Sequence, residues 1–338
     1  MNVTDLLTKK NMGYVRKGII WGLLSGIFCG FLTIFEDSGL STEPFSSATV
    51  LSLMAVPIIF GFLQDLSSCL CVGAINVANG KLREYGRAAA TKPFGLLTIG
   101  AIVGGPGAAC FYLCGVFFAG PFYPVVISAT FPAFGALLAR IVLKEKIDKR
   151  MWLGILLAIV GAIIVSGGSE AVDVSQYPHF TLGIIFGVLA ALGWAVEGVI
   201  SNAGMDFIDP EVANGLRYTV SVLFYMIIGI PLISGIGPVA GYRLVGSAFM
   251  TKAILFAFLA GAVEGVGYYY YYKSCNACGS ARGMTLNSTY TAWSCIICAL
   301  VYGEALPLSF WIGLVIIIGG GVLIAGNPTK IFNLREMD

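Results

Sequence analysis

Three carboxylic acids lie inside long apolar stretches of the sequence, where burying a charge is costly. Asp65, Glu197 and Glu264 each stand near the middle or in the inner half of a stretch long enough to cross a membrane. Ionisable residues at such depth are candidates for a solute or proton pathway by default. We expect no lysine or arginine at comparable depth, so a mobile positive charge, either a proton or a cationic solute, is predicted to neutralise these acids.

Aromatic and amide side chains share helix faces with these acids. Residues at i+4 and i+7 lie on one face of a helix, which places Tyr268 and Tyr271 beside Glu264. Trp194 lies one turn before Glu197 in the same way, and a further segment offers an amide and two rings on one face. The predicted substrate-binding residues are Glu264, Tyr268, Tyr271, Trp194, Glu197, Asn287, Tyr290, Trp293 and Asp65.

An acid beside tyrosine and tryptophan rings suits an organic cation. Each ring contributes roughly 0.5 to 2 kcal/mol of cation–π attraction, so an amine or a quaternary ammonium compound is the favoured solute. Rings near a membrane surface also anchor helices whatever the solute. We assign that anchoring role to Tyr269, Tyr270 and Tyr272, which complete a run of five tyrosines.

Two of the acids have a second interpretation. Glu197 could form a salt bridge with Arg217 at the beginning of the seventh apolar segment. A buried carboxylate has a raised pKa, so Asp65 could carry a proton or be held neutral by hydrogen bonds with Gln64 and Ser68. Both alternatives stay open on the sequence alone.

An intramembrane enzyme or a metal site is not predicted. The single histidine, His179, lies in a loop, and no His or Cys pair stands beside a carboxylate at helical spacing. Cys275, Cys278, Cys295 and Cys298 match a zinc-site spacing. A helix between the two pairs would separate them by roughly 25 Å, however, which is too far for one ion. We therefore expect no catalytic residue, no cofactor and no nucleic-acid partner.

The elements that position these residues are long apolar helices. The chain is 57% hydrophobic and 11% charged, whereas a soluble domain is about 25% charged. Runs of about 20 apolar residues span a bilayer. They predict an all-α integral membrane protein with ten transmembrane helices near Lys17–Phe35, Ser47–Val77, Thr91–Phe118, Pro121–Leu143, Met151–Ser166, Thr181–Ala203, Asn214–Ser234, Thr251–Lys273, Cys278–Tyr302 and Leu308–Gly326.

The distribution of cations predicts the orientation. Lysine and arginine accumulate in short cytoplasmic loops. With both termini in the cytoplasm, all 20 cations except Arg243 and Lys252 fall on or beside cytoplasmic segments. The exterior loop after the first helix carries Glu36 and Asp37 instead. We predict a multi-pass protein of the cell (inner) membrane, with its first helix retained because Met1–Lys17 lacks a signal-peptide pattern.

The two halves of the chain resemble each other. Gly18-Ile-Ile-Trp-Gly22 recurs as Gly183-Ile-Ile-Phe-Gly187. Four residues recur at a constant separation of 159, namely Glu145, Trp152, Gly154 and Gly161 as Glu304, Trp311, Gly313 and Gly320. An odd number of helices in each unit inverts the second copy. The prediction is a 5+5 inverted-topology repeat with domains at 1–168 and 181–327.

Matching interruptions in the two halves point to the binding site. Gly104-Gly-Pro-Gly107 interrupts the third segment, and Glu264-Gly-Val-Gly267 occupies the corresponding part of the eighth. Paired interruptions of this kind are the best sequence indication of a transporter's solute site. We therefore expect both helices to be weakened at this depth.

These features resemble the drug/metabolite transporter superfamily, specifically members with two EamA-type domains. The resemblance is strongest at Leu143-Lys-Glu-Lys146 with Trp152-Leu-Gly154, and at Tyr302-Gly-Glu-Ala305 with Trp311-Ile-Gly313. The first motif has Lys144 where the family usually has glycine. The resemblance implies a ten-helix fold in which the fifth and tenth helices stand aside from a central cavity, and it implies no particular solute.

The predicted function is secondary active transport of a small polar organic solute by alternating access, with the lipid bilayer as surroundings. An organic cation is favoured. The alternative is a proton-coupled carrier of a neutral or zwitterionic metabolite, such as an amino acid, sugar or nucleobase. A channel or a membrane scaffold is a more distant alternative, since no ion filter is recognisable.

Overall fold

Every regular element of the described chain is a helix, as the apolar composition predicts. The computed structural model describes residues 3–48, 54–142, 149–167, 177, 179–303 and 305–324. Inside a bilayer the backbone finds no water, so helices satisfy its hydrogen bonds internally. The first half forms α1 (Val3–Gly30), α2 (Leu32–Leu40), α3 (Phe45–Ala48), α4 (Ala55–Ala78), α5 (Leu82–Ala89), α6 (Pro93–Ile102), a π-helical segment (Val103–Ala109), α7 (Cys110–Ala119), α8 (Phe122–Ser128), α9 (Phe131–Val142) and α10 (Lys149–Gly167). The second half forms α11 (Phe180–Gly204), α12 (Pro210–Phe224), a second π-helical segment (Tyr225–Ile233), α13 (Gly237–Ala248), α14 (Ala253–Cys278), α15 (Ser280–Asn287), α16 (Tyr290–Tyr302) and α17 (Leu308–Ile324).

Seven helical segments of the described chain are long and apolar enough to cross a membrane, some of them built from two or three consecutive helices. They are Gly13–Leu40, Ala55–Ala78, Pro93–Ala119, Phe180–Gly204, Pro210–Ile233, Ala253–Cys278 and Ser280–Tyr302. Three shorter apolar helices, Phe122–Leu138, Trp152–Val165 and Leu308–Leu323, follow the predicted pattern. A multi-pass helical membrane protein is thereby confirmed, and the count of ten crossings stays a prediction.

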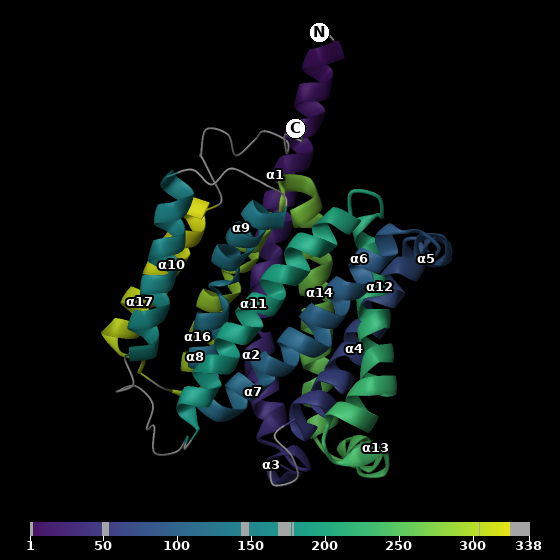
Figure 1. Cartoon of the computed structure of the whole chain (residues 1–338), viewed down its shortest axis with the longest axis vertical. Coiled ribbons are helices and arrows are strands. Elements are labelled where there is room, and N and C mark those ends of the chain that lie inside the picture. Colours follow the sequence, from purple (N-terminus) through teal and green to yellow (C-terminus); the bar gives the residue numbers. More distant parts are fainter. Residues whose placement is uncertain are drawn as a thin grey trace.

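The helices α10 and α17 pair with each other at one side of the bundle (Figure 1). A Cβ on Gly161 would stand 2.8 Å from the carbonyl oxygen of Gly313, and a Cβ on Gly320 would stand 2.6 Å from that of Gly154. The two contacts are reciprocal, because Gly154 and Gly161 correspond to Gly313 and Gly320 in the repeat. Two-fold symmetry produces self-complementary contacts of this kind. The recurring glycines therefore serve the close approach of these two helices.

Small residues also let α1 approach the helices of the other half. A Cβ on Gly22 would stand 2.6 Å from the Cβ of Leu286 on α15. A Cβ on Gly26 would stand 3.3 Å from the carbonyl oxygen of Asn287. The glycine stripe of α1 serves close helix packing, and it brings α15 against the part of α1 that reaches the cavity described below.

The predicted interruption of the third apolar segment is present. Residues 103–109 wind as a π-helix between α6 and α7, with Pro106 inside it. Proline has no amide hydrogen and its ring crowds the carbonyl four residues earlier. A wider turn accommodates both effects, and such π-helical bulges are frequent at functional sites.

The predicted interruption of the eighth segment was wrong, because α14 is regular from Ala253 to Cys278. Its glycines serve contact rather than bending. A Cβ on Gly265 would stand 3.1 Å from the Cα of Ser68 on α4, and one on Gly267 would stand 2.5 Å from the sulfur of Cys29 on α1. Close packing on both neighbours thus explains glycine at these positions without a break.

The first apolar segment is interrupted at Phe31, between α1 and α2. The carbonyl oxygen of Gly30 accepts a hydrogen bond from Ser294 Oγ at 3.0 Å, so this acceptor is satisfied at the interruption. Beyond Phe31 the helix continues to Leu40, past the expected end at Phe35. Glu36 therefore lies inside α2 with 1% of its surface exposed. Its predicted position in an exterior loop was wrong.

Candidate functional site

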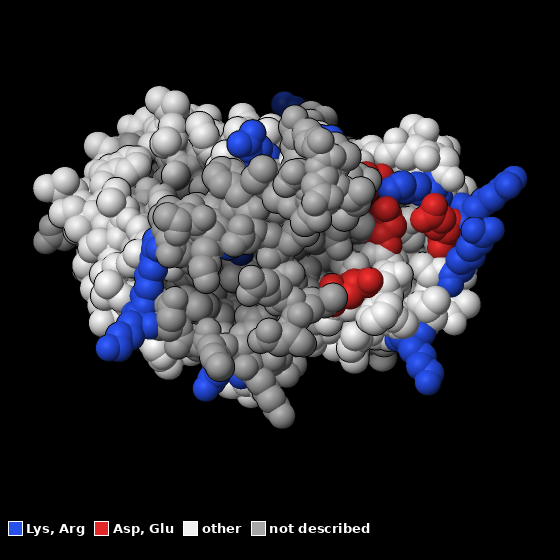
Figure 2. Space-filling view, turned by 90° about the horizontal axis from the view of Figure 1, so that it is seen from above, with Lys and Arg blue, Asp and Glu red and all other residues white. Residues whose placement is uncertain are grey.

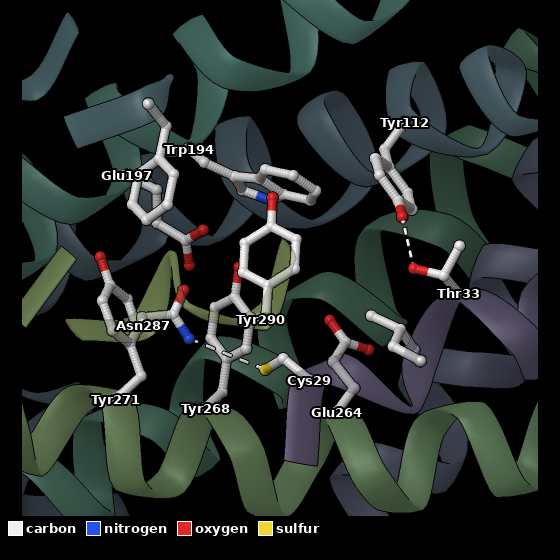
Figure 3. A pocket seen from close by; sticks show the side chains of 12 residues that line it. Cys29, Thr33, Tyr112, Trp194, Glu197, Glu264, Tyr268, Tyr271, Asn287 and Tyr290 are labelled. Carbon is white, nitrogen blue, oxygen red and sulfur yellow. Dashed lines mark hydrogen bonds between the residues drawn. The ribbon is translucent and has the colours of Figure 1, made fainter. Parts of the chain in front are cut away.

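A narrow cavity lies at the centre of the bundle, between the two halves of the chain. Its unfilled space is about 510 Å³, of which water centres reach about 30 Å³. At about 10–15 Å³ for each water molecule, that is room for two or three. The lining side chains come from α1, α2, α7, α9, α11, α14, α15 and α16 (Figure 3): Cys29, Leu32, Thr33, Tyr112, Phe131, Trp194, Glu197, Glu264, Tyr268, Tyr271, Asn287 and Tyr290.

A buried arginine joins the three acids identified from the sequence. Arg217 on α12 is 1% exposed, and its Nε donates to Glu197 Oε1 at 3.0 Å. Its Nη1 lies 3.6 Å from Asp65 Oδ1 and 3.8 Å from Glu264 Oε1. The expectation that no cation reaches this depth was therefore wrong. The salt bridge considered for Glu197 is present, and the same guanidinium also contacts the other two acids.

The position of Arg217 follows from where α12 begins. Asp209 caps the helix by accepting from the amide of Glu211 at 2.9 Å, and Pro210 occupies its first turn. Aspartate at the N-cap followed by proline is a standard helix start. The helix therefore begins four residues before the expected Asn214, which puts Arg217 about 10 Å along it at 1.5 Å per residue. This signal was present in the sequence and was missed.

Further hydrogen bonds hold the acids in place. Gln64 Nε2 donates to Glu264 Oε2 at 3.0 Å, and Tyr272 OH donates to Glu197 Oε1 at 3.1 Å. Ser221 Oγ donates to Asp65 Oδ2. The anchoring role assigned to Tyr272 was wrong, because its hydroxyl donates to Glu197 in the charged cluster and its side chain is buried.

The guanidinium of Arg217 is covered by rings and does not line the cavity. It stacks over Tyr218 at 4.4 Å and over Tyr268 at 4.6 Å from the ring centroids. Neither Nη1 nor Nη2 makes a hydrogen bond to the described residues. Glu197 and Glu264 line the cavity, with Arg217 behind them. The charged side chains that face the cavity are therefore carboxylates.

The first π-helical segment packs directly against this cluster. A Cβ on Gly104 would overlap the carboxylate of Glu197. A Cβ on Gly105 would stand 2.5 Å from Ser221 Oγ and 3.4 Å from Asp65 Oδ2. The carbonyl oxygen of Gly104 also accepts a hydrogen bond from the indole of Trp194 at 3.2 Å. The interruption therefore positions both an acid and a ring of the cavity wall.

Aromatic rings form most of the cavity wall. The rings of Tyr268 and Tyr271 meet edge to face, with centroids 5.4 Å apart, and Tyr112 lies 5.3 Å from Trp194. Glu197 on α11 and Glu264 on α14 reach the space beside these rings from different helices (Figure 3). Tyr290 OH is bonded to Ser128 Oγ at 2.7 Å. The wall thus offers π faces to a solute, while the hydroxyls of Tyr290 and Tyr112 have partners of their own.

The cavity wall also carries polar, uncharged side chains. Asn287 Nδ2 donates to Ser25 Oγ at 2.6 Å and approaches the sulfur of Cys29 at 3.8 Å. Thr33 Oγ1 and Tyr112 OH share a hydrogen bond of 2.8 Å. These groups fix the orientation of α1, α7 and α15 around the cavity.

Seven of the nine predicted site residues line the cavity, and two do not. Asp65 stands behind the wall, where it pairs with Arg217. Trp293 is 42% exposed on α16, and its Cβ packs on Gly30 of α1. Its predicted place beside Asn287 and Tyr290 was wrong, because α15 and α16 meet at a turn around Thr289 that interrupts the helical register.

Several cavity residues were not predicted: Cys29, Leu32, Thr33, Tyr112 and Phe131. Most are ordinary apolar or weakly polar side chains, which carry no signal of depth or partner in a membrane sequence. Residues 143–148 and Glu304, which hold the two acidic motifs of the family resemblance, lie outside the described residues.

Comparison with known proteins identifies the class. The EamA-like transporter family matches this chain twice, over residues 16–167 and 181–326. Protein LicB of Haemophilus influenzae is 27% identical over 310 residues, which cover 91% of this chain and 97% of that protein. An uncharacterized transporter of Clostridium kluyveri is 22% identical over 216 residues, or 63% of this chain and 66% of that protein.

A solved structure, described only as the crystal structure of a protein, has the same fold. Its TM-score is 0.60 at 16% identity, and the similarity covers 91% of this chain and 96% of that one. The chain belongs to the EamA-like transporter family. It is a multi-pass membrane transport protein, as the resemblance to the drug/metabolite transporter superfamily implied.

Proposed function

We propose that the protein is a secondary transporter that moves a small organic cation, an amine or a quaternary ammonium compound, by alternating access. The observation that carries the proposal is the composition of the cavity wall. Two carboxylates and six aromatic rings face the cavity, and the arginine of the charged cluster stands behind them. A cation between such rings gains about 0.5 to 2 kcal/mol from each ring it contacts.

The charge balance of the cluster supports a mobile positive charge. Asp65, Glu197 and Glu264 share one described cation, Arg217. With all four groups ionised the cluster carries two uncompensated negative charges, and an unpaired buried charge costs several kcal/mol. An organic cation beside Glu264 or Glu197 offsets one of them. Protons on the remaining acids offset the rest.

The narrowness of the cavity supports a small solute and a change of conformation. Water centres reach about 30 Å³ in this structure, which is less than an ammonium compound with several methyl groups requires. Rotation of Tyr268 and Tyr271, whose rings close the wall beside Glu264, would enlarge it. Alternating access requires a closed intermediate of this kind, in which the solute is shielded from both sides.

The arrangement of charge supports a cytoplasmic location for one end of the molecule. Lysine and arginine side chains lie on the end face seen in Figure 2, around α5 and the beginnings of α6 and α10, beside several acidic side chains. Arg243 and Lys252 belong to the opposite end, near α13. By the positive-inside rule, we place this face in the cytoplasm of a cell-membrane protein. In the proposed topology both termini also lie in the cytoplasm. The chain crosses the membrane ten times, as two inverted units at 1–168 and 181–327.

The acid surplus also supports one alternative. If protons alone neutralise the surplus, a neutral or zwitterionic metabolite would occupy the aromatic cavity instead. The rings and the Asn287 amide would then carry recognition, and Glu264 would serve only as the proton site.

Binding by the purified protein tests the proposal. Tetramethylammonium is expected to raise the unfolding temperature, whereas uncharged tert-butanol of similar size, D-glucose and zwitterionic glycine betaine are expected to have a smaller effect. A ligand at 100 times its Kd stabilises the folded state by about 2.7 kcal/mol. Stabilisation by the neutral or zwitterionic probes but not by tetramethylammonium would overturn the cation proposal.

Neutralising one acid separates the two mechanisms. Glu264→Gln is expected to abolish tetramethylammonium binding, because the amide keeps the shape and removes the charge. Under the alternative, the same variant would still bind and exchange its solute but would lose acceleration by a pH gradient. Glu84→Gln, on the exposed face of α5, is the matched control and is expected to behave as the wild type.

A further inference from the structure

A fourth carboxylate is buried close to the cavity and has no assigned role. Glu36 lies on α2, 1% exposed, one turn after Thr33 of the cavity wall. Its neighbour Asp37 points elsewhere and accepts a hydrogen bond from Tyr302 near the molecular surface. The helix ends at Leu40, so Glu36 is about 6 Å from that end at 1.5 Å per residue. Glu36 thus stands between the cavity and one end of the bundle.

One amide links Glu36 to the acid of the cavity. The side chain of Gln64 on α4 also lies close enough to Glu36 to interact with it. Its Nε2 donates to Glu264 Oε2 at 3.0 Å. An amide of this kind holds two carboxylates on either side of itself. Glu36 and Glu264 are therefore joined through a single side chain, from α2 across α4 to α14.

Two hydrogen-bond acceptors near this link have no donor in the described part of the chain. Glu36 Oε2 and Gln64 Oε1 are both buried acceptors without a donor among the described residues. A buried acceptor without a partner costs about 1–3 kcal/mol, and more when it is charged. A proton on Glu36 removes the charge and provides a hydroxyl that donates. The pair is therefore complete only when Glu36 is protonated.

The groups that face Glu36 offer no positive charge to replace that proton. The titratable groups that interact with it electrostatically, from its own helix and from those packed around it, are Asp37 on α2, Glu264 on α14, Tyr112 on α7, Tyr290 on α16 and Cys29 on α1. All of these are acids. Within the described residues, Arg217 contacts Asp65, Glu197 and Glu264, and no ion pair joins it to Glu36.

We propose that Glu36 is the proton-binding residue that exchanges protons between Glu264 and the end of the bundle where α2 terminates. In this step the O–H bond of the Glu36 carboxyl breaks and an O–H bond forms on Glu264. Glu36 becomes the carboxylate and Glu264 becomes neutral, so the charge of the pair is unchanged. Gln64 gives up no proton itself; it keeps the two carboxylates close enough for one water molecule to pass the proton.

The consequence for transport is competition at Glu264. A proton on Glu264 removes the charge that attracts an organic cation, so the proton and the cation occupy this acid alternately. The inference rests on the proposed function, and it adds the residue that would connect a proton gradient to solute movement. Exchange of one proton for one monovalent cation leaves the net charge of the cavity unchanged.

The test compares Glu36→Gln with the wild type in proteoliposomes. Tetramethylammonium binding and its exchange at equal pH are expected to stay within about two-fold. Accumulation driven by a pH gradient, and the proton flux reported by an enclosed pH dye, are expected to fall at least ten-fold. Asp37→Asn is the matched control, since it neutralises the adjacent acid, which is bonded to Tyr302, and should retain both.

A second variant tests the link itself. Gln64→Leu keeps both carboxylates and removes the amide, and it is expected to show the same loss of gradient-driven accumulation even if Glu36→Gln does not fold. Wild-type coupling in either variant would overturn the role of Glu36. Failure of the wild-type protein to bind tetramethylammonium would instead contradict the proposed function, so the two failures are distinguishable.

Discussion

Removing the buried arginine is the most direct test of the charged cluster. Arg217→Gln leaves Asp65, Glu197 and Glu264 without the cation that lies 3.0 to 3.8 Å from their oxygens. At 3.0 Å and an effective dielectric constant of 20, one such pair attracts by about 5 kcal/mol. Part of that attraction offsets the cost of burial, so removing one partner of a buried pair typically costs about 3–5 kcal/mol. We expect a loss of that size in the free energy of unfolding.

A double mutant separates charge from packing. In Arg217→Gln with Glu197→Gln, the closest acid is neutral and the two amides can bond each other. The double variant is expected to recover about 2 kcal/mol relative to Arg217→Gln, a coupling within the range measured for contacting residues. Unfolding by SDS titration in mixed micelles measures both values. Arg243→Gln, on an exposed part of α13, is the control and should change the free energy by less than about 0.5 kcal/mol.

The pH dependence of the single mutant has a definite sign. Without the guanidinium, the folded state binds protons on the buried acids more readily than the unfolded state does. Stability of Arg217→Gln should therefore increase as the pH falls, since stability decreases with pH where the folded state holds more protons. Unchanged stability in Arg217→Gln, or a double mutant no better than the single, would refute the assignment of Arg217 as the shared counter-ion.

Two further predictions concern the walls and one end of the bundle. Gly104→Ala is expected to lower solute uptake at least about ten-fold, because its Cβ would overlap the carboxylate of Glu197 and a misplacement of about 1 Å at a site can cost as much as about 100-fold. Gly95→Ala is the control, since its Cβ would meet no atom within 4 Å, and it should transport normally. Lys273→Met removes the 2.6 Å ion pair with Glu211 between the end of α14 and the beginning of α12. Because both side chains are largely shielded, we expect the free energy of unfolding to fall by about 1 kcal/mol. Amide hydrogen exchange in the first turn of α12 should become faster. Unchanged exchange there would contradict the idea that this ion pair holds the two helices together.

The sequence alone determined the class of fold and most of the cavity wall. Apolar length is a local property, so Ala55–Ala78 and Ala253–Cys278 could be recognised as membrane-spanning helices without knowing their neighbours. Helical spacing then placed Tyr268 and Tyr271 on the face of Glu264, because α14 is regular through all three. The position of each acid within an apolar run is also a local property, so the sequence alone marked the acids as functional candidates.

Helix bends and close contacts were decided by packing between helices. The glycine beside Pro106 and the glycines after Glu264 look alike in sequence, yet the first group lies in a π-helical segment and the second in a regular helix that presses on Ser68. Only the neighbouring backbone distinguishes the two. The turn around Thr289 likewise turned Trp293 away from the face that holds Asn287.

The partners of the buried charges were decided by tertiary structure. Arg217 reaches three acids because α12 packs on α4 and α14 and the long arginine side chain also reaches Glu197 on α11, and no local pattern encodes that arrangement. Glu36 looked like a residue of an exterior loop, but the helix resumes after Phe31 as α2 and keeps Glu36 buried in the bundle. Apolar length and periodicity act within one helix, whereas the energy of a buried charge depends on what the other helices bring to it.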